Sequence, residues 1–183
     1  MKPSPALRHD LVAAVPSLRA FGISLSGDAD RADDLVQETL VKAWSNLDSF
    51  QEGTNLRAWL FTILRNQFYS EMRKKKREVE DADGSLQASL SVPAAQQGHM
   101  DMVDFRRALL QLPDDQREAL ILVGASGFAY EEAAEICGVA VGTIKSRVSR
   151  ARLKLAEILK LGKDANFGTD TAVEMVATVV GHR

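Results

Sequence analysis

Basic and hydroxyl side chains are concentrated in one short segment of this 183-residue chain, between residues 141 and 155. Such cations bind phosphate oxygens, and lysine, arginine and serine also hydrogen-bond to the edges of bases. The pattern is typical of a helix that contacts nucleic acid, although a solvated basic helix face would have the same composition. The candidate contacts are Thr143, Lys145, Ser146, Arg147, Ser149, Arg150 and Arg152.

The segment that leads into this helix fits a helix-turn-helix. Ala134 provides a small side chain where two helices cross closely, and Gly138 can adopt the positive φ that a short turn requires. Ile144 and Val148 then face back towards the first helix. In this motif the start of the second helix lies in the major groove of DNA. We expect Cys137 to be a packed residue rather than a reactive thiol.

A second group of candidate nucleic-acid contacts lies in the N-terminal half, over residues 55–77. It mixes aromatic and basic side chains on one predicted helix and carries a net charge of +6. Stacking aromatics beside phosphate-binding cations suit single-stranded or opened nucleic acid. The alternative is that most of the aromatics are core and the polar residues are ordinary surface. The candidates here are Arg65, Asn66, Arg73 and Lys74.

The segment 28–44 is acidic on one helical face and apolar on the other. Residues 28–38 have a net charge of −4, and acids in the first turn suit the helix dipole. The acidic face is either a solvated surface or a docking surface for a basic partner.

Apolar residues recur at helical spacing on both sides of residues 78–100. We therefore predict an all-α fold of two small helical domains joined by a flexible linker. Pro16 is expected to kink or restart the first helix. Thr54 or Asn55 is expected to cap the helix that follows, and Asp114 to be the N-cap of a later one. The predicted domains are residues 1–77 and 101–161, with a linker at 78–100 and a C-terminal tail at 162–183.

Composition excludes several classes of protein. One cysteine excludes an intrachain disulfide framework, and no apolar run is long enough to cross a membrane. The three histidines are scattered, without the spacing of a metal site or of a nucleophile with its base. We therefore expect a cytoplasmic protein that is no enzyme and needs no cofactor. The absence of a sustained heptad predicts a monomer.

These pieces resemble the extracytoplasmic-function (ECF, group 4) sigma factors of bacterial RNA polymerase. The strings that carry the resemblance are DLVQETLVKAWSNLDSF (34–50), NLRAWLFTILRNQFYSEMRKKKR (55–77) and LPDDQREALILVGASGFAYEEAAEICGVAVGTIKSRVSRAR (112–152). The third is similar to the EcfG type of the general stress response.

The resemblance implies that the N-terminal domain is σ2, which recognises the −10 promoter element. Asn66 matches the position that helps to hold a flipped −10 base. Residues 50–55 match the adjoining specificity loop, which makes Thr54 and Asn55 further −10 candidates. The positions that match the helix docked on the β′ clamp helices of core polymerase are Asp33, Asp34, Gln37, Glu38, Lys42 and Trp44.

The C-terminal domain would be σ4, a helix-turn-helix that reads the −35 element beside the β flap. Lys145, Ser146 and Ser149 are the base-edge candidates, and the three arginines of that helix are the phosphate candidates. EcfG relatives imply a GGAAC-like −35 element and a NepR-type anti-sigma factor. The alternative is a sigma-like module that sequesters the anti-sigma factor, as PhyR-type proteins do, but the chain has no room for a receiver domain after residue 161.

Overall fold

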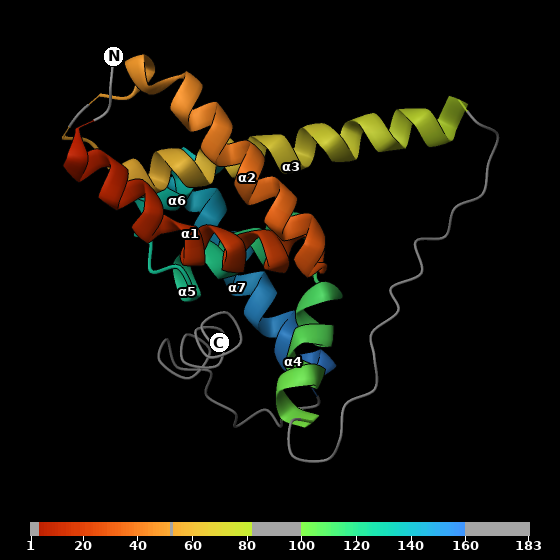
Figure 1. Cartoon of the computed structure of the whole chain (residues 1–183). Helices are drawn as coiled ribbons and strands as arrows, with labels where there is room; N and C mark the ends of the chain where they lie inside the picture. The colour runs from red at the N-terminus through yellow and green to blue at the C-terminus, as the bar shows by residue number, and fades with distance from the viewer. Residues whose placement is uncertain (1–3, 52, 82–99, 160–183) are drawn as a thin grey trace.

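The N-terminal half of the chain forms a bundle of three long helices. The computed structural model describes residues 4–51, 53–81 and 100–159. Helix α1 spans Pro5–Ser26, α2 spans Ala29–Ser45 and α3 spans Leu56–Asp81, with a short 3-10 turn at Leu47–Ser49 (Figure 1). Helix α3 therefore extends four residues into the segment that was predicted to be linker, and its C-terminal end projects from the body of the molecule (Figure 1).

Among the described residues, the C-terminal half contains four helices. They are α4 (Met100–Leu110), α5 (Asp114–Gly124), α6 (Tyr130–Cys137) and α7 (Val141–Ile158). Over the described ranges every regular element is a helix, which confirms the predicted all-α fold. The predicted flexibility of the linker at 82–99, and the tail from residue 160 onwards, lie outside the described residues.

Side-chain caps mark where α2 and α3 begin. Asp28 accepts a hydrogen bond from the backbone N–H of Arg31 (2.9 Å), and Asn55 accepts one from Ala58 (3.0 Å). The prediction of Asp114 as an N-cap is wrong, because Pro113 occupies that position and Asp114 is the first helical residue. There its carboxylate binds Arg117 at 2.7 Å instead of capping the backbone.

Pro16 does not restart the first helix, since α1 is assigned as one helix through it. A proline in a helix leaves the carbonyl four residues earlier without its usual donor. Here Pro16 is exposed, and Val12 one turn earlier is 70% exposed. We infer that water can satisfy the freed carbonyl on this outer face.

Close packing of α1 on α2 depends on Gly22. A Cβ atom at this position would lie only 3.1 Å from the Cβ and 3.3 Å from the Cα of Ala32. This close approach packs the apolar face of α2 on α1, and Leu35 and Ala43 of α2 are buried. The outer face of α2 remains acidic and exposed.

The helix-turn-helix prediction is confirmed in detail. Gly138 ends α6 with φ of 66°, and its N–H donates to the carbonyls of Ala134 and Glu135. Ile144 and Val148 of α7 are buried against the rest of this region. The backbone turn thus sets α7 against α6 and leaves the polar face of α7 outside.

The two halves share one hydrophobic core. The ring of Phe61 in α3 stacks on Phe21 of α1 (4.8 Å between centroids) and meets Phe128 of the C-terminal half edge-on (4.9 Å). Helix α3 packs on α6, and α1 packs on α5 (Figure 1). In this structure the two halves are therefore packed against each other.

Candidate nucleic-acid interface

A polar hollow lies between α2 and one face of α3. Its volume is about 470 Å³, within the usual range of ligand sites. Asn66 is exposed in it, and Trp59 and Ile63 give it an apolar wall. The lining consists of Lys42, Asn46, Ser49, Trp59, Ile63, Asn66, Gln67, Ser70 and Arg73.

Lys42 points to this hollow rather than to an outer binding surface. Its ammonium group donates to the side-chain oxygen of Gln67, and the amide nitrogen of Gln67 donates to Glu38 and to Glu71 (2.7 Å for Glu71). The resemblance grouped Lys42 with the polymerase contacts. The structure places it beside Asn66 as a cation on the hollow's wall.

The loop that precedes α3 is fixed at the rim of the hollow. The ring of Phe50 packs on Trp59 with 5.1 Å between centroids. Within the loop the hydroxyl of Thr54 donates to the carbonyl of Gln51 (2.7 Å) and remains exposed. The predicted specificity loop therefore does adjoin the hollow that contains Asn66.

Four other −10 candidates lie on α3 or directly before it. Arg73 lines the hollow, and Lys74 is exposed beyond it. Asn55 instead donates to Glu132 of α6 (2.6 Å), and Arg65 pairs with Glu118 of α5 (Nε to Oε1, 2.6 Å). In this structure Asn55 and Arg65 therefore contact the C-terminal half of the chain.

Helix α7 presents its polar residues on an open face. Lys145, Ser149 and Arg150 are exposed, and Thr143 and Ser146 are half-buried near the start of the helix. Arg147 is held by Asp115 (3.1 Å), so in this structure it belongs to an ion pair with α5.

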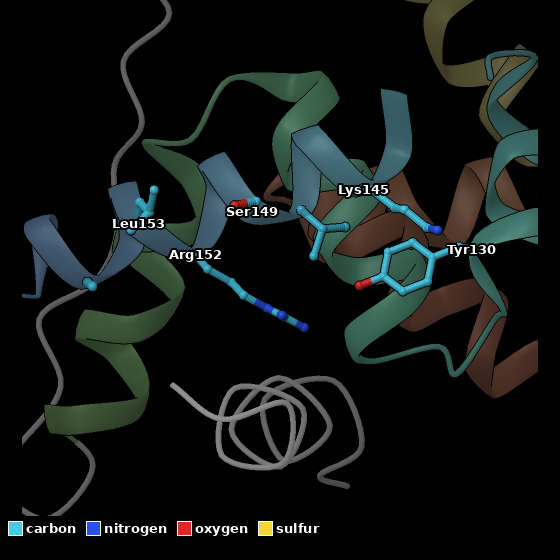
Figure 2. A pocket seen from close by; sticks show the side chains of 7 residues that line it. Tyr130, Lys145, Ser149, Arg152 and Leu153 are labelled. Atoms are coloured by element: carbon cyan, nitrogen blue, oxygen red, sulfur yellow. The ribbon is translucent and has the colours of Figure 1, made fainter. Parts of the chain in front are cut away.

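A shallow groove of about 320 Å³ runs along one side of α7 (Figure 2). The ammonium group of Lys145 extends over the ring of Tyr130, 5.9 Å from its centroid. Arg152 points into the same groove, while Leu153 is 71% exposed at its edge. Cations beside an aromatic ring and a hydroxyl are suitable contacts for the backbone and bases of a duplex.

The predicted polymerase face of α2 combines acids with exposed apolar side chains. Asp34, Gln37 and Glu38 are exposed, and Asp33 pairs with Arg19 of α1 at 2.6 Å. Trp44 on the same helix is 53% exposed. Val41, which the sequence analysis did not select, is 66% exposed one turn before it. An apolar residue three positions before Trp44, on the acidic face of the predicted helix, is the sequence signal that could have identified Val41.

Cys137 is buried beside Glu118 at the helix-turn-helix corner. Burial raises the pKa of its thiol to about 12, and the charge of Glu118 adds to the effect. At pH 8 the thiolate fraction of Cys137 is then ~1000-fold below that of an ordinary cysteine thiol. We expect iodoacetamide to alkylate the folded chain at least ~100-fold more slowly than the guanidinium-unfolded chain. Equal rates would contradict the buried, packed position.

Within the described ranges, no helix has the length and apolarity to span a membrane, and no group of His, Cys, Asp and Glu side chains is arranged to hold a metal ion.

Comparison with known families and structures agrees with this geometry. Residues 11–78 match the family Sigma-70 region 2, and residues 102–155 match Sigma-70, region 4. A solved structure, the sigma factor RpoE of Bartonella quintana in complex with the anti-sigma factor NepR, shares 58% identity with a TM-score of 0.79, covering 87% of this chain and 100% of that one. The PhyRSL–NepR complex of Sphingomonas sp. Fr1 shows a shared fold at 20% identity, with a TM-score of 0.62 over 85% of this chain and 91% of that one.

The sequence comparison identifies the family. The ECF RNA polymerase sigma factor EcfG of Rhodopseudomonas palustris is 64% identical over 171 residues, which cover 93% of this chain and 94% of that protein. The hollow on α3, the basic face of α7 and this likeness agree, and the chain belongs to the ECF family of RNA polymerase sigma factors.

Proposed function

We propose that this chain binds core RNA polymerase and gives it promoter specificity, with α2 and α3 acting at the −10 element and α7 at the −35 element. The observation that carries the proposal is that one chain holds a polar hollow of about 470 Å³ beside Asn66 and a helix-turn-helix with a basic second helix, in the order of the family. The likeness to EcfG further supports control of general stress response genes.

The hollow suits an unstacked base of the −10 element. Flipping a base out of a duplex costs a few kcal/mol, so a pocket that compensates only for the right base reads sequence. Asn66 offers both a donor and an acceptor, and Trp59 offers an apolar wall. Lys42 and Arg73 lie where phosphates or base oxygens would approach.

At the −35 element α7 would enter the major groove. Lys145, Ser146 and Ser149 remain the base-edge candidates, and Arg150 and Arg152 are placed for phosphates. For Arg147 a phosphate contact would require release from Asp115. A GGAAC-like element is the sequence we propose this helix reads.

The acidic and apolar face of α2 would bind the β′ clamp helices of core polymerase, and α4–α7 would lie beside the β flap. An anti-sigma factor of the NepR type is the inhibitor we propose, because the B. quintana relative was solved in complex with NepR. The alternative, a module that only sequesters such an inhibitor, is less well supported. The likeness to PhyRSL is 20%, whereas that to EcfG is 64%.

The role of Asn66 gives a direct prediction. With 2-aminopurine at successive adenines of the −10 non-template strand, holoenzyme should raise the fluorescence at the position of the flipped base. Asn66→Ala should weaken promoter binding by about 10-fold or more, the usual cost of one good base contact, and reduce that signal. Ser45→Ala, an exposed change on α2 away from the hollow, should leave both unchanged. If Asn66→Ala left the fluorescence signal unchanged, Asn66 would not be the residue that holds the flipped base.

The proposed function as a whole is tested by complex formation on promoter DNA. Core polymerase, the chain and a duplex with a GGAAC-like −35 element should form a heparin-resistant complex in a mobility-shift assay. Omitting the chain, or scrambling the −35 element, should abolish it. A stable complex with the scrambled element would contradict −35 reading by α7.

A further inference from the structure

A line of polar side chains lies where α2 packs on α3 (Figure 1). On α2 it consists of Arg31, Glu38 and Lys42, which share one face of the helix because they are seven and four positions apart. On α3 it consists of Gln67 and Glu71, one turn apart. Arg31 pairs with Glu71 at 3.6 Å at one end of the line, and Lys42 at the other end lines the hollow. Gln67 is the neutral member among four charged ones.

The partners of Gln67 fix the orientation of its amide group. An amide has two N–H donors and one oxygen acceptor, whereas a carboxylate only accepts. The nitrogen of Gln67 donates to the carboxylates of Glu38 and Glu71 (2.7 Å for Glu71). Its oxygen accepts from the ammonium group of Lys42, which only donates. The opposite amide orientation would break all three hydrogen bonds.

Gln67 lies between two residues that would otherwise pair directly. Glu38 and Lys42 are four positions apart on α2 with the acid on the N-terminal side, which is the favourable arrangement for a helical ion pair. In this structure Gln67 binds both of them instead. Because its oxygen is neutral, it holds the ammonium group without compensating the charge as a carboxylate would. Two N–H donors of Lys42 are left for a ligand.

The hollow beside Lys42 has the electrostatics of a site for an oxygen acceptor. Among the described residues that line it, Lys42 and Arg73 are cations and none is an acid. Asn66 is exposed in the same hollow. A single strand of DNA offers two kinds of acceptor to an ammonium group, the phosphate oxygens and the oxygens on base edges.

We propose that Gln67 is a positioning residue for promoter recognition. It prevents Glu38 from pairing with Lys42 and holds the ammonium group of Lys42 at the hollow, where that group binds an oxygen of the −10 non-template strand. The inference rests on the proposed function for its ligand, although the hydrogen-bond arrangement itself does not. It also gives Glu38, which the resemblance groups with the polymerase contacts, a supporting role within this network.

The test measures the affinity of isolated holoenzyme for fluorescent DNA that carries only a −10 element with its non-template strand unpaired. In Gln67→Leu, Lys42 should pair directly with Glu38, and affinity should fall by about 10-fold through loss of one charged hydrogen bond. If the acceptor is a phosphate, the log–log salt slope should decrease by ~0.7 and every −10 sequence should be weakened alike. If it is a base oxygen, discrimination should be lost at one position.

A double-mutant cycle separates positioning from a merely structural role. Lys42→Gln should weaken binding as much as Gln67→Leu, and the two together should cost no more than either alone, because Gln67 acts through Lys42. Adding Glu38→Gln to Gln67→Leu should restore most of the affinity, since that carboxylate no longer captures Lys42. Gln111→Leu makes the same change at an exposed residue outside the hollow and serves as the control.

Additive losses from Gln67→Leu and Lys42→Gln, or no recovery with Glu38→Gln, would overturn the positioning role. The network is also tested in the free chain, without polymerase or DNA. In NMR spectra the side-chain amide protons of Gln67 should show nuclear Overhauser effects to the side chains of Glu38 and Glu71, and their absence would overturn the arrangement. If these effects are present but wild-type holoenzyme does not bind the −10 strand, the proposed function fails, and with it the ligand of Lys42.

Discussion

Replacement of Trp44 by alanine is expected to weaken binding of the chain to core polymerase by about 30-fold or more. Trp44 is 53% exposed on α2, beside Val41 at 66% and among acidic residues. Exposed tryptophans on such faces are frequent hot spots, whose truncation costs at least ~2 kcal/mol of binding free energy. The measurement is a titration of fluorescently labelled chain with core polymerase.

The control for this experiment is Val12→Ala, which truncates an apolar side chain of α1 that is 70% exposed. We expect that variant to bind core polymerase normally. Because Trp44 is outside the core, Trp44→Ala should keep the wild-type melting temperature. Unchanged affinity of Trp44→Ala would place the polymerase contact elsewhere on the chain.

The second large effect is on stability, and it is expected for Phe61→Ala. Phe61 is fully buried and touches Phe21 on one side and Phe128 on the other, so its removal leaves a cavity between the two halves. Phenylalanine-to-alanine changes in cores cost ~3–5 kcal/mol of the free energy of unfolding. We expect the melting temperature to fall by roughly 10 °C, measured by circular dichroism.

Phe50→Ala is the comparison for that variant, because Phe50 is only half-buried and its ring packs at a tilt against Trp59 at the rim of the hollow. It should lower the melting temperature by clearly less than Phe61→Ala does. If the two variants melted alike, the shared core around Phe61 would not be the centre of the fold.

The local features of the fold were predictable because short-range chemistry determines them. Asn55 caps α3 as expected, Asp28 caps the acidic start of α2, and Gly138 turns the chain between α6 and α7. Residues 113 and 114 show the limit of this reasoning. A proline followed by two acids allows the helix to begin at either of two residues. The carboxylate of Asp114 binds Arg117 instead of capping the backbone.

The long-range contacts could not be predicted in the same way. Arg65 and Glu118 are 53 positions apart in segments with separate patterns, and nothing in either pattern indicates the other. An arginine on a basic, aromatic helix has the same appearance whether it binds phosphate or a buried carboxylate. Likewise the position of Lys42 depends on how α2 crosses α3, which sequence periodicity does not specify.

The central claim, that this chain directs polymerase to promoters, is tested most directly by run-off transcription with core RNA polymerase on a template with a GGAAC-like −35 element. Transcripts of defined length should appear only when the chain is added, and should weaken with Asn66→Ala or Arg150→Ala. Absence of transcripts together with failure of the chain to co-elute with core polymerase in gel filtration would contradict the claim.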